Sequence, residues 1–508
     1  MINLRRFLAA AGCILAASAA IFADRLIVLH TNDAHSQIDP ADNGLGGVAR
    51  RKAAIDSIRV IYDNVLLIDA GDAVQGTMYF TIYKGEVEYG LLDSLGYDIA
   101  VLGNHDFDNG VEALEKNLAR SKTTWLSANY DMSGAPGLDS VFQPYIIKDY
   151  GSKKVGVMGI NLVPEGMIAK GNYDGVVYRD AYQAAYETAK KMKNQGADYV
   201  IAVTHIGYDG RIDPTDVRLA GKSSDIDLII GGHSHSLIRP DALQTDRYHW
   251  KHVNANGDTI GVVQAGSRGA YLGKVEIDLD NGATDYELIT IDSTFDGRLD
   301  PAVVAVIDGY RNAVDSIMHI PAATAARALP KNDAGLMNFL GEFVAYRGQQ
   351  LSGRDIDMSL INSGGVRREL PEGAVSKGML IDMLPFNNRI VVLEISGADL
   401  MEAVNGVVKR GGFDGVNDRV KVVFDPDKKE YVSATIDGVE ISPDRTYTLS
   451  TIDYLANGGD YMTSLPRAKV IARSPAVLYS DLIDYVETVW KDRPLDGEPA
   501  RRILPIKQ

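Results

Sequence analysis

The sequence is almost devoid of cysteine. Its 508 residues contain a single one, Cys13, which lies in an apolar stretch close to the N-terminus. If that stretch is removed as a leader, the mature chain has no thiol and can form no disulfide. Its stability must then come from packing, and bound metal is the other candidate source.

Long uncharged runs are also scarce. Residues 7–23 form one, preceded by Arg5 and Arg6, which is the pattern of a secretory signal peptide over residues 1–23. The run is short for a membrane span. We therefore expect cleavage near Asp24, no stable membrane insertion, and a periplasmic or secreted protein. An uncleaved membrane anchor and lipidation at Cys13 are the alternatives.

An excess of basic residues is missing as well. Lys and Arg total 52 against 68 Asp and Glu, a formal charge of −16. This balance argues against nonspecific nucleic-acid binding, which needs a basic face. An anionic substrate would need locally placed cations. With 45% hydrophobic and 24% charged residues the chain is an ordinary globular mixture, long enough for two large domains or about three average ones.

The first half of the chain alternates short apolar runs with amphipathic segments such as residues 181–193. This alternation predicts an α/β sheet with helices on both faces. Active sites in such sheets lie beyond the carboxyl ends of the strands. The predicted strands cover residues 26–29, 65–68, 99–102, 155–160, 199–203 and 227–230.

The pattern changes near residue 300. Asp300 and Pro301 form an N-cap and first-turn pair, apolar residues then recur at helical spacing, and Pro321 ends the helix. We interpret residues 300–321 as a connector helix between a first domain, 24–299, and a second, 322–508. The second domain mixes strands at 358–361, 389–395, 419–424 and 446–451 with short helices such as 398–404.

Histidine, aspartate and asparagine follow five of the apolar runs directly. Because several strand ends meet at one edge of a sheet, these side chains should converge. Imidazole together with carboxylate suits Zn, Mn, Fe or Co rather than Mg or Ca. A carboxylate such as Asp72 can bridge two ions about 3.5–4 Å apart, which activate water and bind a phosphoryl oxygen. The segments are 30–35, 69–72, 103–108, 204–205 and 231–235.

In order along the chain, these motifs resemble the calcineurin-like metallophosphoesterase superfamily: Asp33-x-His35, Gly71-Asp72, Gly103-Asn104-His105-Asp106, His205 and Gly232-His233-x-His235. The resemblance implies a four-layer β-sandwich flanked by helices. It assigns one divalent ion (Zn, Mn or Co) to Asp33, His35, Asp72 and His235, and a second to Asp72, Asn104, His205 and His233.

The same resemblance implies that His105 is not a metal ligand. His105 would stabilise the transferring phosphoryl group and could assist the leaving group, and Asp108 would orient its ring. Asp106 is the alternative orienting carboxylate.

The second domain contains a glycine-rich loop, Asn362–Arg367, and two turns that each place an aromatic residue beside polar groups. Glycine lets a ligand approach the backbone, and Arg367 could bind phosphate with both arms. Phe386 and Tyr454 could sandwich a flat base, a contact worth about 1–3 kcal/mol. Asp460 could accept hydrogen bonds from ribose hydroxyls. The alternative is that both aromatics belong to the core.

Together these motifs resemble the C-terminal domain of the 5′-nucleotidase family. The resemblance implies that Phe386 and Tyr454 clamp the base, that Asp460 and Asn388 bind the nucleoside, and that Arg367 binds phosphate, with Asn362 among the substrate residues. It also implies that the second domain rotates at the connector to carry substrate to the metal site.

The sequence departs from the family pattern in three places. The family usually has a second cation that binds phosphate, an arginine near the start of the C-terminal domain, and here Arg327 or Lys331 would replace it. Tyr454 stands where many members have Phe, and Asn387 stands where many have Gly. We predict a two-metal enzyme that releases phosphate from nucleoside monophosphates, and that could also split UDP-sugars or cyclic nucleotides. The alternatives are a thiosulfohydrolase-like enzyme and a nucleoside-binding protein with a decayed metal site.

Overall fold

The computed structural model describes residues 25–506 apart from 42, 170, 211–212 and 332. The predicted leader and Cys13 lie outside the described residues. Within them, no helix combines the length and apolar character needed to cross a membrane.

The chain forms two compact units. The first contains the residues through Gln75, Tyr83–Pro164 and Gly171–Tyr310, and the second contains Gly76–Ile82, Glu165–Lys170 and the chain from Arg311 onward. The division falls within helix α9 (Pro301–Met318), inside the segment interpreted as a connector. The two short segments that join the second unit were not anticipated from the sequence.

The first unit is built on two sheets with parallel strands at their centres. In the first sheet β1 pairs parallel with β2, and β2, β3, β4 and β6 continue in parallel, while β14 and β15 add antiparallel strands on the other side. Its strands are β15 (Thr284–Thr290), β14 (Tyr271–Asp278), β1 (Arg25–Thr31), β2 (Val65–Asp69), β3 (Ile99–Ala100), β4 (Thr124–Leu126) and β6 (Phe142–Gln143), in that order.

In the second sheet β8, β10, β11 and β13 are parallel, and β7 and β12 close the edges in antiparallel fashion. The strands are β12 (Lys251–Val253), β13 (Thr259–Val263), β11 (Leu228–Ile230), β10 (Tyr199–His205), β8 (Lys153–Asn161) and β7 (Tyr145–Tyr150). Every residue of β10 is buried, which explains its continuous apolar sequence.

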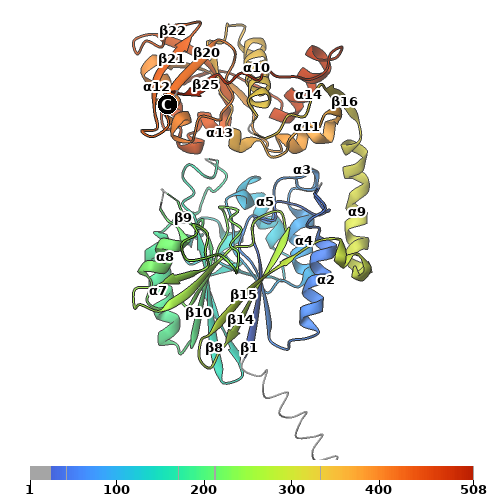
Figure 1. The fold of residues 1–508 in the computed structure, drawn as a ribbon, viewed down its shortest axis with the longest axis vertical. Helices are drawn as coiled ribbons and strands as arrows, with labels where there is room; N and C mark the ends of the chain where they lie inside the picture. Colours follow the sequence, from blue (N-terminus) through green and yellow to red (C-terminus); the bar gives the residue numbers. More distant parts are fainter. Residues whose placement is uncertain (1–24, 42, 170, 211–212, 332, 507–508) are drawn as a thin grey trace, which may run out of the picture. The chain divides into compact units, whose positions relative to one another are not determined.

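Helices cover the outer faces of this sandwich (Figure 1). On one side lie α2 (Val48–Arg59) and α4 (Glu86–Leu95), and on the other α7 (Ala181–Asn194) packs on β8 and β10, near α8 (Asp216–Lys222). The N-cap of α7 is Asp180, whose carboxylate accepts the backbone N–H of Gln183 at 2.8 Å. This arrangement confirms the predicted α/β sandwich. The smaller elements of the first unit are α5 (Gly110–Leu118), α6 (Pro136–Asp139), β5 (Tyr130–Asp131) and β9 (Val177–Tyr178), whereas α3 (Met78–Tyr83) lies, up to Ile82, in a segment that joins the second unit.

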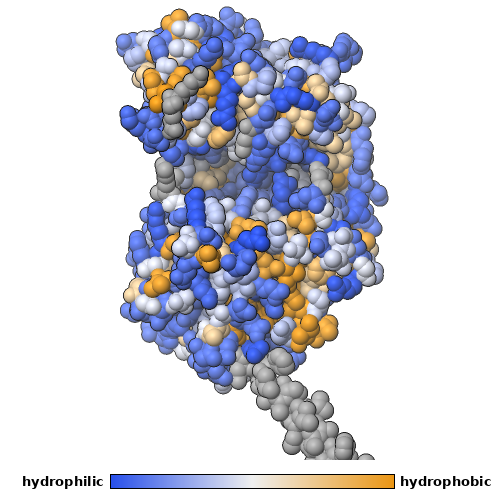
Figure 2. All heavy atoms as spheres, viewed as in Figure 1, coloured by the Kyte–Doolittle hydropathy of each residue, from blue (hydrophilic) through white to orange (hydrophobic). Residues whose placement is uncertain are grey.

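The second unit is a mixed α+β domain. Its core packs α10 (Ala334–Ser352) against β19 (Ile390–Ser396) and β23 (Thr446–Ile452). Phe339 and Phe343 of α10 are buried, and both contact the ring of Tyr485. One sheet runs β17-β23-β19-β24, another β22-β21-β20-β25, and β16 pairs with β18. The visible face of each unit is mainly hydrophilic (Figure 2). Further elements are β16 (Pro321–Ala325), β17 (Met358–Ser359), β18 (Gly373–Ser376), α11 (Lys377–Met383), α12 (Gly397–Lys409), β20 (Val420–Asp425), β21 (Glu430–Ile436), β22 (Val439–Glu440), α13 (Asp453–Ala456), β24 (Lys469–Arg473), α14 (Leu478–Val489) and β25 (Ile503–Pro505).

Candidate active site

The side chains predicted as ligands all follow strand ends in the first unit. Asp33 and His35 come after β1, Asp72 after β2 and Asn104 after β3, all in the first sheet. The second sheet supplies the others: His205 is the last residue of β10, and His233 and His235 come after β11. Parallel pairing aligns the carboxyl ends within each sheet, so one edge of the sandwich collects them.

Most of these turns use left-handed backbone. The φ angles are 49° at Asp33, 47° at His35, 55° at Asp72, 76° at His233 and 53° at His235. A residue other than glycine reaches this region at a cost of about 1–3 kcal/mol, and such residues cluster at functional sites. Strain at five of the predicted ligands is therefore consistent with selection for geometry rather than for stability.

Two groups of side chains meet at this edge. In one, Nε2 of His35 and Nε2 of His235 are 2.8 Å apart, and Nε2 of His235 lies 3.4 Å from Oδ1 of Asp33. In the other, Nε2 of His205 lies 3.2 Å from Oδ2 of Asp72 and 3.9 Å from Oδ1 of Asp33. Each group offers three ligand atoms within 4.8 Å of one another.

The two groups share Asp33 in this structure. Asp72 belongs to one of them, and its second oxygen accepts the backbone N–H of His105 at 2.9 Å. The two remaining predicted ligands contact each other, with Nδ1 of His233 3.0 Å from Oδ1 of Asn104. The structure therefore brings all seven predicted ligands together, and the assignment of Asp72 as the bridge stays a prediction.

The donor set fits a divalent metal centre. Nδ1 of His205 donates to the carbonyl oxygen of Ala70 at 2.7 Å, which leaves Nε2 of the neutral ring as the atom that faces the carboxylates. A histidine that binds metal through one ring nitrogen typically donates a hydrogen bond from the other, as His205 does here. Asp33, Asp72 and His205 are all buried, and buried charges of this kind are usually paired or coordinate metal.

Charge within the cluster shifts the pKa values strongly. Burial alone would raise the pKa of Asp72, but His205, His105 and His35 hold it well below its usual range. Burial would also lower the pKa of His205, but Asp72 and Asp33 raise it to about 10. Metal binding requires this ring to be neutral, so a divalent ion would take the place of the proton.

His105 lies beside the ligand groups, with its ring centroid 5.4 Å from that of His35, and it has a carboxylate of its own. Its Nδ1 lies 3.0 Å from Oδ2 of Asp108. Asp106 has a different environment: Oδ2 accepts the backbone N–H of Gly103 at 2.6 Å, and Oδ1 accepts the hydroxyl of Tyr89 at 2.7 Å. Burial and the charge of Asp72 raise the pKa of Asp106 to about 7. The structure thus places Asp108 beside the ring, and Asp106 ties the ligand loops together.

The predicted nucleoside residues lie in the second unit. Both oxygens of Asp460 are engaged there: Nδ2 of Asn362 donates to Oδ2 at 2.8 Å, and the hydroxyl of Tyr454 donates to Oδ1 at 3.0 Å. The guanidinium of Arg367 lies over the ring of Phe386, 5.5 Å from its centroid. Asn388 precedes β19, and its carbonyl oxygen accepts the N–H of Leu478 at 2.7 Å.

Comparison with known proteins matches both halves of the chain. Residues 26–237 match the calcineurin-like phosphoesterase family, and residues 313–467 match the 5′-nucleotidase C-terminal domain. The chain belongs to the 5′-nucleotidase family. It is therefore a metallophosphoesterase hydrolase with a His/Asp metal site, and the family implies a nucleotide substrate.

Individual relatives of this family member cover most of its length. It is 29% identical to a snake venom 5′-nucleotidase of Naja atra over 86% of this chain and 90% of that protein. It is 27% identical to the trifunctional nucleotide phosphoesterase protein YfkN of Bacillus subtilis over 95% of this chain, but it spans only 35% of that longer protein. The crystal structure of a 5′-nucleotidase precursor from Thermus thermophilus superposes with a TM-score of 0.84 at 26% identity, over 95% and 100% of the two chains.

Arg327 and Lys331 are the two residues of this family member predicted to supply the second cation that binds phosphate. Arg327 is engaged by two carboxylates, with Nη2 3.2 Å from Asp333 and Nε 3.2 Å from Asp496. Lys331 is exposed. Neither arrangement excludes either residue, so both stay candidates.

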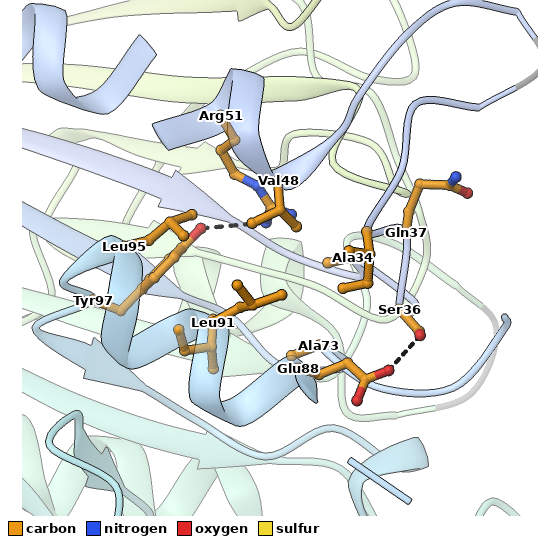
Figure 3. A pocket seen from close by; sticks show the side chains of 12 residues that line it. Ala34, Ser36, Gln37, Val48, Arg51, Ala73, Glu88, Leu91, Leu95 and Tyr97 are labelled. Carbon is orange, nitrogen blue, oxygen red and sulfur yellow. Dashed lines mark hydrogen bonds between the residues drawn. The ribbon is translucent and has the colours of Figure 1, made fainter. Parts of the chain in front are cut away.

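One buried carboxyl of this phosphoesterase was missed. Glu88 on α4 receives a hydrogen bond from the hydroxyl of Ser36, the residue after His35 (Figure 3). Both line a cavity of about 20 Å³, room for about one water, together with Arg51 and Tyr97, whose hydroxyl accepts from Arg51 Nη1 at 3.4 Å. Burial raises the pKa of Glu88 to about 7. In the sequence, only its position as an acidic residue on the apolar face of a helix could have identified Glu88 as a buried carboxyl.

Proposed function

We propose that this protein hydrolyses nucleoside 5′-monophosphates to nucleoside and inorganic phosphate, using two divalent ions of the Zn, Mn or Co type. The observation that carries the proposal is the pair of ligand groups that meet at Asp33. Two groups with a shared carboxylate are the arrangement expected for a dinuclear hydrolytic site.

The bound ions would activate water and stabilise charge on the entering and leaving oxygens. The chain's own part begins with the seven ligands, which hold this site at the sheet edge. His105 would donate a hydrogen bond to the phosphoryl group as negative charge develops on it. Asp108 would fix the ring so that Nε2 points away from the carboxylate and toward substrate.

Residues of the second unit would recognise the nucleotide. Phe386 and Tyr454 would hold the base, and Asp460 and Asn388 would bind the nucleoside, with Asn362 steadying Asp460. Arg367 would bind phosphate, since a guanidinium offers two parallel donors to an oxyanion. UDP-sugars and cyclic nucleotides would be additional substrates of the same site.

The apolar leader makes export part of the proposal. The mature protein would begin near Asp24 and act in the periplasm or outside the cell. Intact mass of exported protein tests this: a chain that retains residues 1–23, or an acyl group on Cys13, would contradict it.

Two other functions compete with this proposal. A thiosulfohydrolase-like enzyme would share the metal ligands, but it would have no use for Phe386 and Tyr454 as a clamp for a base. A nucleoside-binding protein with a decayed metal site would not need all seven ligands and His105. Neither alternative accounts for both sets of residues.

The experiment is a phosphate-release screen of purified metal-depleted protein, reconstituted with Mn, Zn or Co in turn. The substrates are nucleoside monophosphates, UDP-glucose, cyclic AMP and p-nitrophenyl phosphate. We expect nucleoside monophosphates to have the highest kcat/KM. Hydrolysis of p-nitrophenyl phosphate with no preference for nucleotides would contradict the substrate assignment, and no metal dependence would contradict the mechanism.

A further inference from the structure

Arg410 is a residue of the second unit to which no role has been assigned above. It caps the C-terminal end of α12, and its side chain is 25% exposed. Its Nη2 pairs with the carboxylate of Asp414, its Nη1 donates to the carbonyl oxygen of Asp460 at 2.9 Å, and its Nε lies 4.0 Å from Oδ2 of Asp460. One guanidinium therefore reaches two separate segments of the chain.

Through Asp414, Arg410 fixes the beginning of the glycine-rich loop. Asp414 is buried, and its Oδ1 accepts both the backbone N–H of Ser363 at 3.0 Å and the hydroxyl of Ser363 at 3.2 Å. Ser363 directly follows Asn362 and opens the turn that leads to Arg367. A buried carboxylate that accepts three hydrogen bonds from one loop and one arginine holds that loop only while its charge is balanced.

Through its contact with the backbone of Asp460, Arg410 also fixes the turn between Tyr454 and Asp460. Asp460 is left-handed, with φ 53°, which costs free energy unless neighbouring groups hold it. Its two carboxylate oxygens each accept one hydrogen bond, from Tyr454 and from Asn362. A carboxylate has about four acceptor positions, so each oxygen can accept one further donor.

We propose that Arg410 is a positioning residue for nucleotide recognition: it couples the glycine-rich loop to the Tyr454–Asp460 turn and so sets the Asp460 carboxylate to accept the two ribose hydroxyls. The proposal rests on the proposed function, because the diol is that of a nucleotide. Arg410 acts through Asp414 and Asp460 and need not touch the substrate itself.

The expected effect is on binding of the ribose diol. Arg410→Met keeps the aliphatic length and removes the charged donors. We expect kcat/KM for AMP to fall about 10- to 100-fold, mainly through KM, as for loss of a hydrogen bond to a charged group. For 2′,3′-dideoxy-AMP, which has no diol, and for p-nitrophenyl phosphate, kcat/KM should change much less.

A matched control and a rescue distinguish positioning from stability. Arg467, at the end of the 3₁₀ turn Leu465–Arg467, binds Asp399 of α12 with Nε 2.8 Å from Oδ1, so Arg467→Met removes an arginine contact to α12 while it leaves the bonds of Arg410 to Asp414 and Asp460 in place. It should leave the AMP to dideoxy-AMP ratio unchanged. Added guanidinium at millimolar concentration should restore part of the AMP activity of Arg410→Met, and Arg410→Lys should keep more activity than Met.

Several results would overturn the proposal. Equal losses for AMP, dideoxy-AMP and p-nitrophenyl phosphate would make Arg410 a stability residue only. An unchanged AMP to dideoxy-AMP ratio would show that Asp460 keeps its place without it. If Arg410→Met fails to fold, Asp414→Asn, which changes the carboxylate paired with Arg410, is tested in its place. The same two comparisons decide: AMP against dideoxy-AMP, and AMP against p-nitrophenyl phosphate. Failure of the proposed function would be seen separately, in the parent protein, as no preference for AMP over p-nitrophenyl phosphate.

Discussion

Nδ1 of His105 lies 3.0 Å from Oδ2 of Asp108, the residue three positions later. His105 opens the short 3₁₀ turn His105–Phe107 that follows β3, and Asp108 is the C-cap of that turn, so the local backbone keeps the two residues close. This contact sets the ring's tautomer and leaves Nε2 for the substrate.

His105→Ala should therefore reduce kcat without removing metal. We expect a loss of about 10²–10⁴-fold, the range for a proton-transferring or charge-stabilising side chain. Asp108→Asn should lose less, since the amide oxygen can still accept from Nδ1. Elemental analysis of both variants provides the control: a fall in metal content in His105→Ala would mean that the ring is a ligand.

Asp72→Ala should abolish nearly all activity and lower the metal content, because its carboxylate faces His205 at 3.2 Å in the centre of the site. Plasma emission analysis measures the metal per chain. Asp139→Ala, which removes an exposed carboxylate from α6 of the same unit, serves as the control. An active Asp72→Ala protein that keeps two ions would exclude Asp72 as the bridging ligand.

Arg367→Ala should raise KM for AMP and for p-nitrophenyl phosphate alike, since both present a phosphate to the guanidinium. Metal content should stay unchanged. The neighbouring Arg368 pairs with Asp382 at 3.0 Å, so Arg368→Ala is a control one residue away. Equal KM effects from both variants would show that Arg367 has no special role in phosphate binding.

Glu88 predicts a pH dependence of stability. Burial raises the pKa of this carboxyl from 4.5 to about 7, so the folded protein holds its proton more tightly than the unfolded chain does. The resulting stabilisation is fully present below pH 4.5 and is lost as the pH rises through 7. At most it amounts to about 3 kcal/mol.

Glu88→Gln should remove that dependence while keeping an acceptor for Ser36. The urea midpoint of the variant should fall less between pH 5 and pH 8 than that of the parent. Glu112→Gln, at an exposed position on α5, should behave like the parent. A Glu88→Gln profile parallel to the parent's would show that Glu88 does not titrate in this range.

Strand positions could be predicted well from the sequence because apolar runs mark them. The runs at 199–203 and 446–451 fall within β10 and β23. The run at 99–102 was predicted too long, because β3 ends at Ala100 and the chain then turns toward Asn104. Apolar composition alone does not distinguish a buried turn from a strand end.

The candidate site was predictable where residue type and strand position coincide. The five strand-end segments follow from that rule, whereas the choice of seven metal ligands and of the His105–Asp108 pair came from the family resemblance and stays a prediction. Arg410 and Glu88 follow from neither, because each acts through long-range contacts: Arg410 reaches Asp460 fifty positions away, and Glu88 reaches Ser36 across 52. No local pattern encodes such partners.

The central claim is that nucleoside recognition depends on Phe386 and Tyr454 while hydrolysis depends on the His/Asp cluster. The most direct measurement is kcat/KM for AMP and for p-nitrophenyl phosphate in the Phe386→Ala, Tyr454→Ala double variant, with Tyr431→Ala, a half-buried aromatic on β21, as control. Losing about 1–3 kcal/mol of stacking predicts a drop of about 5- to 150-fold for AMP, with p-nitrophenyl phosphate nearly unaffected. A double variant that hydrolyses AMP as well as the parent would contradict the account.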